Sequence, residues 1–192
     1  RIAARWLMSD DWTADFSVHY QDIDADGFAD VDPSTGDLTI AKFKPETRTD
    51  EFIATSLVIT GELDFATLVV AGSYYDRDTL YQHDTQTYAS YFSYFGFGYD
   101  WGEDAKGYLT NEQNNDSKSL EVRLTGAGEK VDWTLGFFYS DLSETWDFKT
   151  YIDNYADSMG FYYLTTYYGF DIAPSDAWWF SSQQTSRETM AV

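Results

Sequence analysis

The stretch QDIDADGFADVD, residues 21–32, carries carboxylates whose type and spacing could bind a metal ion. Its aspartates alternate with apolar residues and are interrupted by Gly27. This order resembles the start of a calcium loop of the D-x-D-x-D-G type, in which carboxylate oxygens surround the ion and the glycine allows a sharp turn. The twelfth position of such a loop should be acidic, but a proline follows here. The candidate ligands are Asp22, Asp24, Asp26 and Asp30.

Two interpretations of this stretch stay open, a calcium site and the acidic, solvated base of a long loop. The aspartates share parity with Phe16, Val18 and Tyr20 of the segment before them. If that segment is a strand that simply continues, successive aspartates point to one side about 7 Å apart and cannot all bind one ion. The parity favours the acidic loop base, and calcium is the alternative.

Two aromatic-rich stretches are the candidates for binding a ligand. They are YASYFSYFGFGYDW at 88–101 and the region 161–180, which contains FYYLTTYYGF and DAWWF. Tyrosine and tryptophan offer a flat apolar surface with a hydrogen-bonding tip, which suits sugars and aromatic chelators. The alternative is that these rings extend strands or pack loop on loop. The candidate contact residues are Tyr91, Tyr94, Tyr99, Trp101, Tyr167, Trp178 and Trp179.

The sequence does not predict an enzyme. The two histidines, His19 and His83, lie far apart in the chain, and no G-x-S-x-G nucleophile motif is present. Carboxylates are abundant, but no pair stands out as a glycosidase acid and nucleophile. We therefore expect no catalytic residues.

Composition limits the class of protein. The chain has 192 residues, no cysteine, and 33 acidic against 12 basic side chains, a formal net charge of −21. Nucleic-acid binding needs clustered positive charge, so the composition argues against that function. Disordered acidic chains are poor in aromatics, whereas aromatics make up 19% of this one, which favours a folded β protein. No apolar run is long enough for a transmembrane helix.

Apolar and polar residues alternate with period two in five stretches, which predicts β-strands. Partial strands at both ends bring the expected number to about seven. The five stretches are 12–21, 51–60, 65–75, 118–126 and 131–140.

The connections between these strands alternate between short and long. Short turns join some pairs, whereas residues 22–49, 77–117 and 146–182 form long connections. Outer-membrane barrels have short periplasmic turns and long extracellular loops, and their strands need about 9–11 residues to cross. We therefore expect an all-β fold, an antiparallel meander forming an arc of a transmembrane β-barrel; a soluble β-sandwich is the alternative. The residues expected to face lipid are Phe16, Val18, Leu120, Val122, Leu124, Leu135 and Phe137.

Four stretches together resemble the barrel portion of TonB-dependent outer-membrane receptors. They are RIAARWLMSDDWTADFSVHYQDID, the long run GDLTIAKFKPETRTDEFIATSLVITGELDFATLVVAGSYYDRD, SLEVRLTGAGEKVDWTLGFFYSD and SSQQTSRETMAV. The plug domain, the energy-coupling box and the aromatic-terminated final strand of that family do not match anything here. The resemblance therefore implies that residues 1–192 are an internal piece of such a barrel.

This resemblance implies a function in uptake at the outer membrane of a Gram-negative bacterium. The expected partners are outer-membrane lipid and lipopolysaccharide, a TonB-type energy-coupling protein that acts through the missing N-terminal region, and a small-molecule or glycan ligand. That ligand would be a scarce solute such as a ferric siderophore, a cobalamin or a glycan. The acidic loops slightly favour a neutral or cationic ligand. The alternatives are a small stand-alone barrel, a calcium-dependent surface module and, less favoured, a polysaccharide-binding sandwich.

Overall fold

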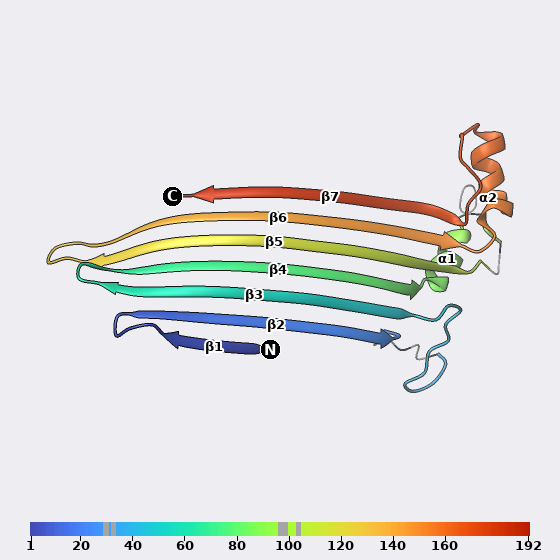
Figure 1. Ribbon diagram of the computed structural model, residues 1–192. Coiled ribbons are helices and arrows are strands. Elements are labelled where there is room, and N and C mark those ends of the chain that lie inside the picture. The colour runs from blue at the N-terminus through green and yellow to red at the C-terminus, as the bar shows by residue number, and fades with distance from the viewer. Residues whose placement is uncertain (29–30, 32–33, 96–99, 103–104) are drawn as a thin grey trace.

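The computed structural model describes all residues except 29–30, 32–33, 96–99 and 103–104. Seven strands form one antiparallel sheet in which every strand pairs with its neighbours in chain order, as Figure 1 shows. The strands are β1 (Ile2–Leu7), β2 (Trp12–Asp26), β3 (Thr47–Leu63), β4 (Ala66–Asp84), β5 (Gly107–Ala127), β6 (Asp132–Ile152) and β7 (Ala177–Ala191). The predicted all-β meander of about seven strands is confirmed, and the sheet is open rather than closed.

All long connections leave from one end of the sheet (Figure 1). They contain the short helices α1 (Gln86–Ser93), η2 (Tyr155–Asp157), α2 (Met159–Tyr162) and η3 (Tyr163–Tyr167). Tight turns occupy the other end, where only Asp64 and Phe65 separate β3 from β4. Among the described residues, the helices are all too short to cross a membrane.

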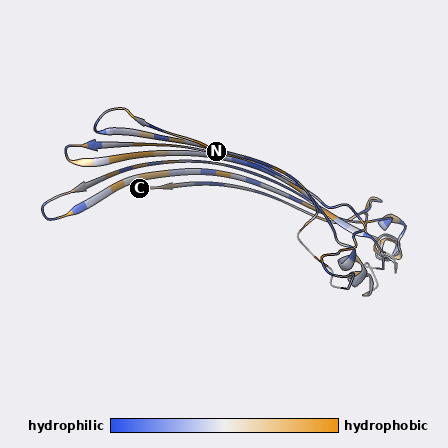
Figure 2. Cartoon of the chain, turned by 90° about the horizontal axis from the view of Figure 1, so that it is seen from below, coloured by the Kyte–Doolittle hydropathy of each residue, from blue (hydrophilic) through white to orange (hydrophobic). Residues whose placement is uncertain are grey.

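The strands are longer than the alternation predicted, so the connections are shorter. They span residues 27–46, 85–106 and 153–176. The stretch Arg77–Asp84, which we expected in a loop, continues β4, because each of its residues pairs with one from Tyr108–Asn115 of β5. Backbone pairing carries these strands beyond the region where apolar residues alternate, and Figure 2 shows the sheet bowed along its length.

The register gives the sheet two chemically different faces. One face, which we call the band face, carries an apolar band across β2 to β6 near the tight turns. In this band Phe16 stands opposite Leu57, Val122 opposite Phe137, and Leu124 opposite Leu135. All seven residues expected to face lipid lie on this face. Phe16, Leu57, Leu120 and Leu135 are exposed, so the described residues leave the band uncovered.

The opposite face, which we call the pocket face, is polar at the same level. Hydroxyl groups pair across strands, with Ser17 Oγ 2.8 Å from Ser56 Oγ and Ser73 Oγ 2.7 Å from Ser119 Oγ. His19 also lies on this face, where its ring meets the edge of Phe52. The buried apolar cluster is elsewhere, at the loop end, and contains Ala89, Trp101, Ala105, Ile152 and Tyr155.

Two tryptophans near the tight turns lie against glycines of neighbouring strands. A Cβ at Gly126 would fall 2.5 Å from the Trp133 ring, and one at Gly61 would fall 2.6 Å from the Trp12 ring. Each glycine therefore lets a large ring lie flat on the sheet, and the ring covers the glycine backbone, which is buried.

We expect Gly126→Ala to lower the free energy of unfolding by about 1 kcal/mol, because the Trp133 ring must leave its site on the sheet. Urea unfolding followed by tryptophan fluorescence measures both the loss and the change at the ring. Gly72→Ala is the matched control, since its Cβ would meet nothing nearer than a carbonyl oxygen at 3.8 Å. Equal behaviour of the two variants would contradict the packing argument.

Candidate functional site

A cavity of about 580 Å³ opens on the pocket face at the loop end of the sheet. Its floor comes from β5 and β6, where Leu109 pairs with Thr150 and Ile152 pairs with Gly107. One wall comes from β4 through Tyr81 and His83, which precede the helix α1. The remaining lining residues are Phe28, Thr85, Tyr88, Ala89, Phe92, Trp101, Phe148, Trp178 and Trp179.

A break in strand pairing shapes the second wall. The register between β6 and β7 pairs Thr150 with Trp179 but Tyr151 with Ala177, so Trp178 is the extra residue of a β-bulge. Consecutive strand residues normally face opposite sides, but both tryptophans line the cavity here, with ring centroids 6.1 Å apart. The ring centroid of Trp178 also lies 4.9 Å from that of Trp101, and the ring centroid of Trp179 lies 5.9 Å from that of Phe148.

The helix α1 reaches the cavity because β5 begins with a glycine. A Cβ at Gly107 would lie 2.9 Å from the Ala89 Cβ and 3.0 Å from Thr85 Oγ1. Only a residue without a side chain allows the helix to approach the strand this closely. The helix then contributes Tyr88 and Phe92 to the lining.

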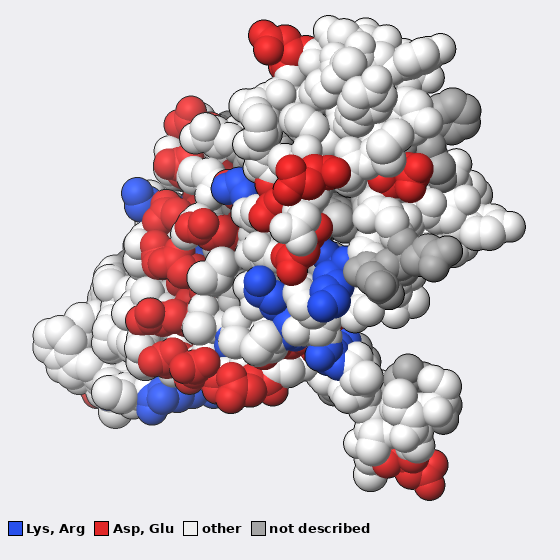
Figure 3. All heavy atoms as spheres, turned by 90° about the vertical axis from the view of Figure 1, so that its right-hand side faces the viewer, with Lys and Arg blue, Asp and Glu red and all other residues white. Residues whose placement is uncertain are grey.

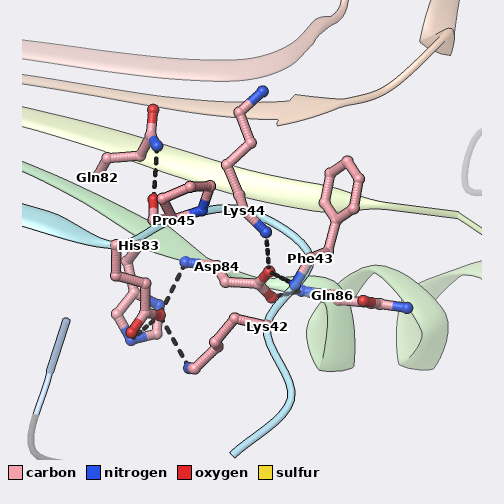
Figure 4. Close-up of polar contacts among 9 residues, drawn as sticks. Lys42, Phe43, Lys44, Pro45, Gln82, His83, Asp84 and Gln86 are labelled. Atoms are coloured by element: carbon pink, nitrogen blue, oxygen red, sulfur yellow. Dashed lines mark hydrogen bonds and ion pairs between the residues drawn. The ribbon is translucent and has the colours of Figure 1, made fainter. Parts of the chain in front are cut away.

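The first long connection is held against the cavity by a network around Asp84, shown in Figure 4. Asp84 Oδ2 accepts hydrogen bonds from the backbone N–H groups of Phe43 at 2.6 Å and Lys44 at 2.8 Å. Its Oδ1 accepts the N–H of Gln86 at 2.9 Å, at the start of α1. One buried carboxylate therefore fastens both the connection and the helix to the end of β4.

A second carboxylate, Glu46, completes this network. Its Oε1 accepts the backbone N–H of Asp84 at 3.0 Å and lies 2.8 Å from Lys42 Nζ. The same oxygen is 3.5 Å from His83 Nε2, which connects the network to the cavity wall. The ring of His83 in turn meets Phe28 with centroids 4.7 Å apart, so the first connection also contributes to the lining.

We expect Asp84→Ala to loosen the connection at Phe43 and Lys44, because the backbone N–H groups of these two residues lose their acceptor. Hydrogen exchange at the amides of Phe43 and Lys44 should accelerate by at least tenfold. Asp78→Ala, an exposed position on the same strand, is the control and should leave both amides unchanged. Unchanged protection in Asp84→Ala would show that the connection is held by other contacts.

Charge is distributed unevenly around the loop end. Figure 3 looks onto this end and shows lysine and arginine side chains gathered into a patch among acidic ones. Lys44 Nζ lies 4.1 Å above the Tyr108 ring, and Lys106 Nζ lies 4.7 Å from the Phe43 ring. Burial raises the pKa of Tyr108, with further upward contributions from the charges of Tyr151, Asp153 and Asp176. The described residues that line the cavity include no lysine or arginine.

An ion network lies on the pocket face between the paired serines and the cavity. Asp50, only 3% exposed, accepts two hydrogen bonds from Arg77, at 2.8 and 2.6 Å, and one from Arg48 at 2.8 Å. These contacts, led by the hydrogen bond from Arg77, hold the pKa of Asp50 below its usual value. This network places charged side chains next to the aromatic walls, on the side nearer the tight turns.

The structure brings together three of the ligand-contact residues expected from the sequence, Trp101, Trp178 and Trp179. Tyr91, Tyr94 and Tyr167 are exposed outside this cavity, with Tyr94 89% accessible. Tyr99 lies outside the described residues. The lining residues that the sequence analysis missed include Phe148 and Tyr81, which sit on strand extensions expected to be loops.

The first part of the acidic stretch, residues 21–26, lies on the end of β2 rather than in a closed loop. Asp22, Asp24 and Asp26 occupy alternate strand positions opposite Glu51, Thr49 and Thr47. Among the described residues, no group of three or more acidic or histidine side chains is placed to hold a metal ion. Asp30 lies outside the described residues, so calcium at this stretch stays a prediction.

Comparison with known proteins does not assign a family. The chain matches no protein-family model, no curated protein and no solved structure. Functional inference therefore depends on the two faces of the sheet and on the cavity.

Proposed function

We propose that this chain is a segment of an outer-membrane β-barrel receptor that takes up a scarce solute from outside the cell. The proposal is supported above all by the aromatic boundary of the apolar band, which runs obliquely across the strands. Hydrocarbon would cover the band face, and the polar pocket face would line the interior of the barrel.

The boundary is marked by Tyr20 on β2, Tyr74 on β4 and Tyr139 on β6. The residue of β4 level with Tyr20 is Asp76, so Tyr74 lies two positions nearer the tight turns. The residue of β6 level with Tyr74 is Asp141, so Tyr139 lies two positions nearer the tight turns than Tyr74 does. The boundary thus shifts by about one residue for each strand.

This shift converts into an angle. One residue advances about 3.3 Å along a strand, and neighbouring strands lie about 4.8 Å apart, so the boundary makes an angle of about 35° with the direction across the sheet. A flat membrane surface cuts tilted barrel strands at such an angle, because transmembrane strands tilt by about 35–45°. A soluble sandwich would need a second layer over the band, and tyrosines in an oblique line would have no such explanation.

The positions of the long connections and of the cavity are consistent with a role in uptake. All long connections lie at one end, and the cavity opens at that same end on the pocket face. A solute from outside would meet this cavity before entering the polar interior. The energy-coupled character of the uptake, its TonB-type partner and the contacts with lipopolysaccharide rest on the family resemblance alone.

Fractionation and uptake test the proposal. A strain lacking the gene is compared with its parent for uptake of iron chelates, cobalamin, glycans and small aromatic compounds, while the tagged full-length protein is located by membrane fractionation. We expect the protein in the outer membrane and a selective loss of one uptake activity. Equal uptake of every compound by the two strains, or recovery of the protein in a soluble fraction, would overturn it.

A further inference from the structure

The aromatic cavity has features that select a chemical class of ligand. Its volume of about 580 Å³ lies within the range that holds a small organic molecule. Its walls stand on β4 and β7, which are separated by β5 and β6 and are therefore about 14 Å apart. Between them the floor side chain on β5 is Leu109, so the cavity has the form of a slot with aromatic rings on both sides.

The hydroxyl and imidazole groups of the lining are few, and all but that of Thr150 lie on the side of β4 and α1. Among the described residues they are Tyr81, His83, Thr85, Tyr88 and Thr150. Thr150 Oγ1 already donates a hydrogen bond to the carbonyl oxygen of Trp179 at 3.1 Å. His83, Thr85 and Tyr88 also line an adjoining, more polar cavity of about 700 Å³ that contains Lys42 and Asp84.

We propose that the slot binds an uncharged small molecule built on a flat aromatic ring system, with a hydrogen-bonding substituent that reaches His83 and Tyr88. Stacking on Trp178, Trp179 and Phe148 provides the contact area, and ring pairs add to the free energy gained by burial. The substituent leaves the slot on the side of the adjoining polar cavity. The claim that this molecule is the transported solute rests on the proposed function. The claim that the slot binds it is tested separately.

Other ligand classes fit the slot less well. A sugar would bury several hydroxyl groups against apolar rings, and each buried hydroxyl without a partner costs free energy. An anionic chelate would place its charge in a slot whose described lining residues include no lysine or arginine, and the formal charge of the chain is −21. The slot therefore discriminates by both shape and charge.

The test uses the full-length protein, in lipid nanodiscs if it fractionates with the membrane and in buffer if it does not. Three probes of defined chemistry are titrated by calorimetry: naphthalene-2-carboxamide, its anionic relative 2-naphthoate, and cellobiose. We expect the amide to bind at least tenfold more tightly than either of the others. Equal affinity for 2-naphthoate or cellobiose would overturn the proposal, as would an absence of amide binding by protein with an unchanged circular dichroism spectrum.

Two variants locate the binding. Trp179→Ala removes a half-exposed ring of the wall and should weaken binding of the amide by about tenfold, and Leu109→Trp should block the slot from its floor. Tyr94→Ala, an exposed ring outside the cavity, is the matched control and should change the affinity less than twofold. Retained affinity in both cavity variants would place the amide elsewhere and overturn the proposal. If the amide binds as expected while uptake is unaffected by gene deletion, only the proposed function fails.

Discussion

Val122→Arg should prevent the full-length protein from assembling in the outer membrane. Val122 lies in the middle of the apolar band, directly opposite Val70 of β4 and Phe137 of β6. If this face meets hydrocarbon, an arginine at mid-depth costs roughly 2–4 kcal/mol. The measurement is the amount of folded, membrane-inserted protein in fractionated cells, which should fall to a small part of the wild-type level.

The matched control for this variant places the same charge on the other face. Ala71 of β4 stands opposite Glu121 of β5 on the pocket face, so Ala71→Arg gains a neighbouring carboxylate and an aqueous surrounding. Its assembly should be close to that of the wild type. Failure of Ala71→Arg together with normal assembly of Val122→Arg would reverse the assignment of the faces, and equal assembly of both would remove it.

Much of the sheet could be predicted from the sequence because its apolar alternation is regular near the tight turns. Residues such as Leu120, Val122 and Leu124 alternate with charged neighbours, and the sheet register confirms that they share one face. Beyond this band the alternation ends, but the strands do not. The run Arg77–Asp84 continues as a strand because backbone groups of β5 pair with it, and such pairing leaves no periodic signal in one sequence.

The cavity was harder to predict for a different reason. Aromatic density included Trp101, Trp178 and Trp179, which line the cavity, but it gave equal weight to Tyr94 and Tyr167, which lie outside the cavity. The distinction depends on a single bulge in β7 and on a glycine that lets α1 approach β5. Both are matters of register and close packing, which the order of residue types does not determine.

The polar network around Asp50 predicts a pH-dependent stability. Asp50→Asn should lower the free energy of unfolding at neutral pH by about 2 kcal/mol, because Arg77 and Arg48 lose a buried counter-charge. We expect a smaller loss in the free energy of unfolding than the 3–5 kcal/mol typical of a broken buried pair, because both guanidinium groups are partly solvated and water screens them. Urea unfolding of the full-length protein measures the difference between variant and wild type.

The sign of the pH dependence follows from the direction of the pKa shift. Arg77 and Arg48 lower the pKa of Asp50 in the folded protein, so its contribution to stability is fully present above its unfolded pKa of about 3.9. That contribution is lost as pH falls further through the folded pKa. The gap between wild type and Asp50→Asn should therefore be constant from pH 7 down to about 5 and close below about 4. Asp15→Asn, which breaks the exposed ion pair with Arg5, is the control and should produce little change at any pH. A gap that stays unchanged at low pH would show that the carboxylate contributes through shape rather than charge.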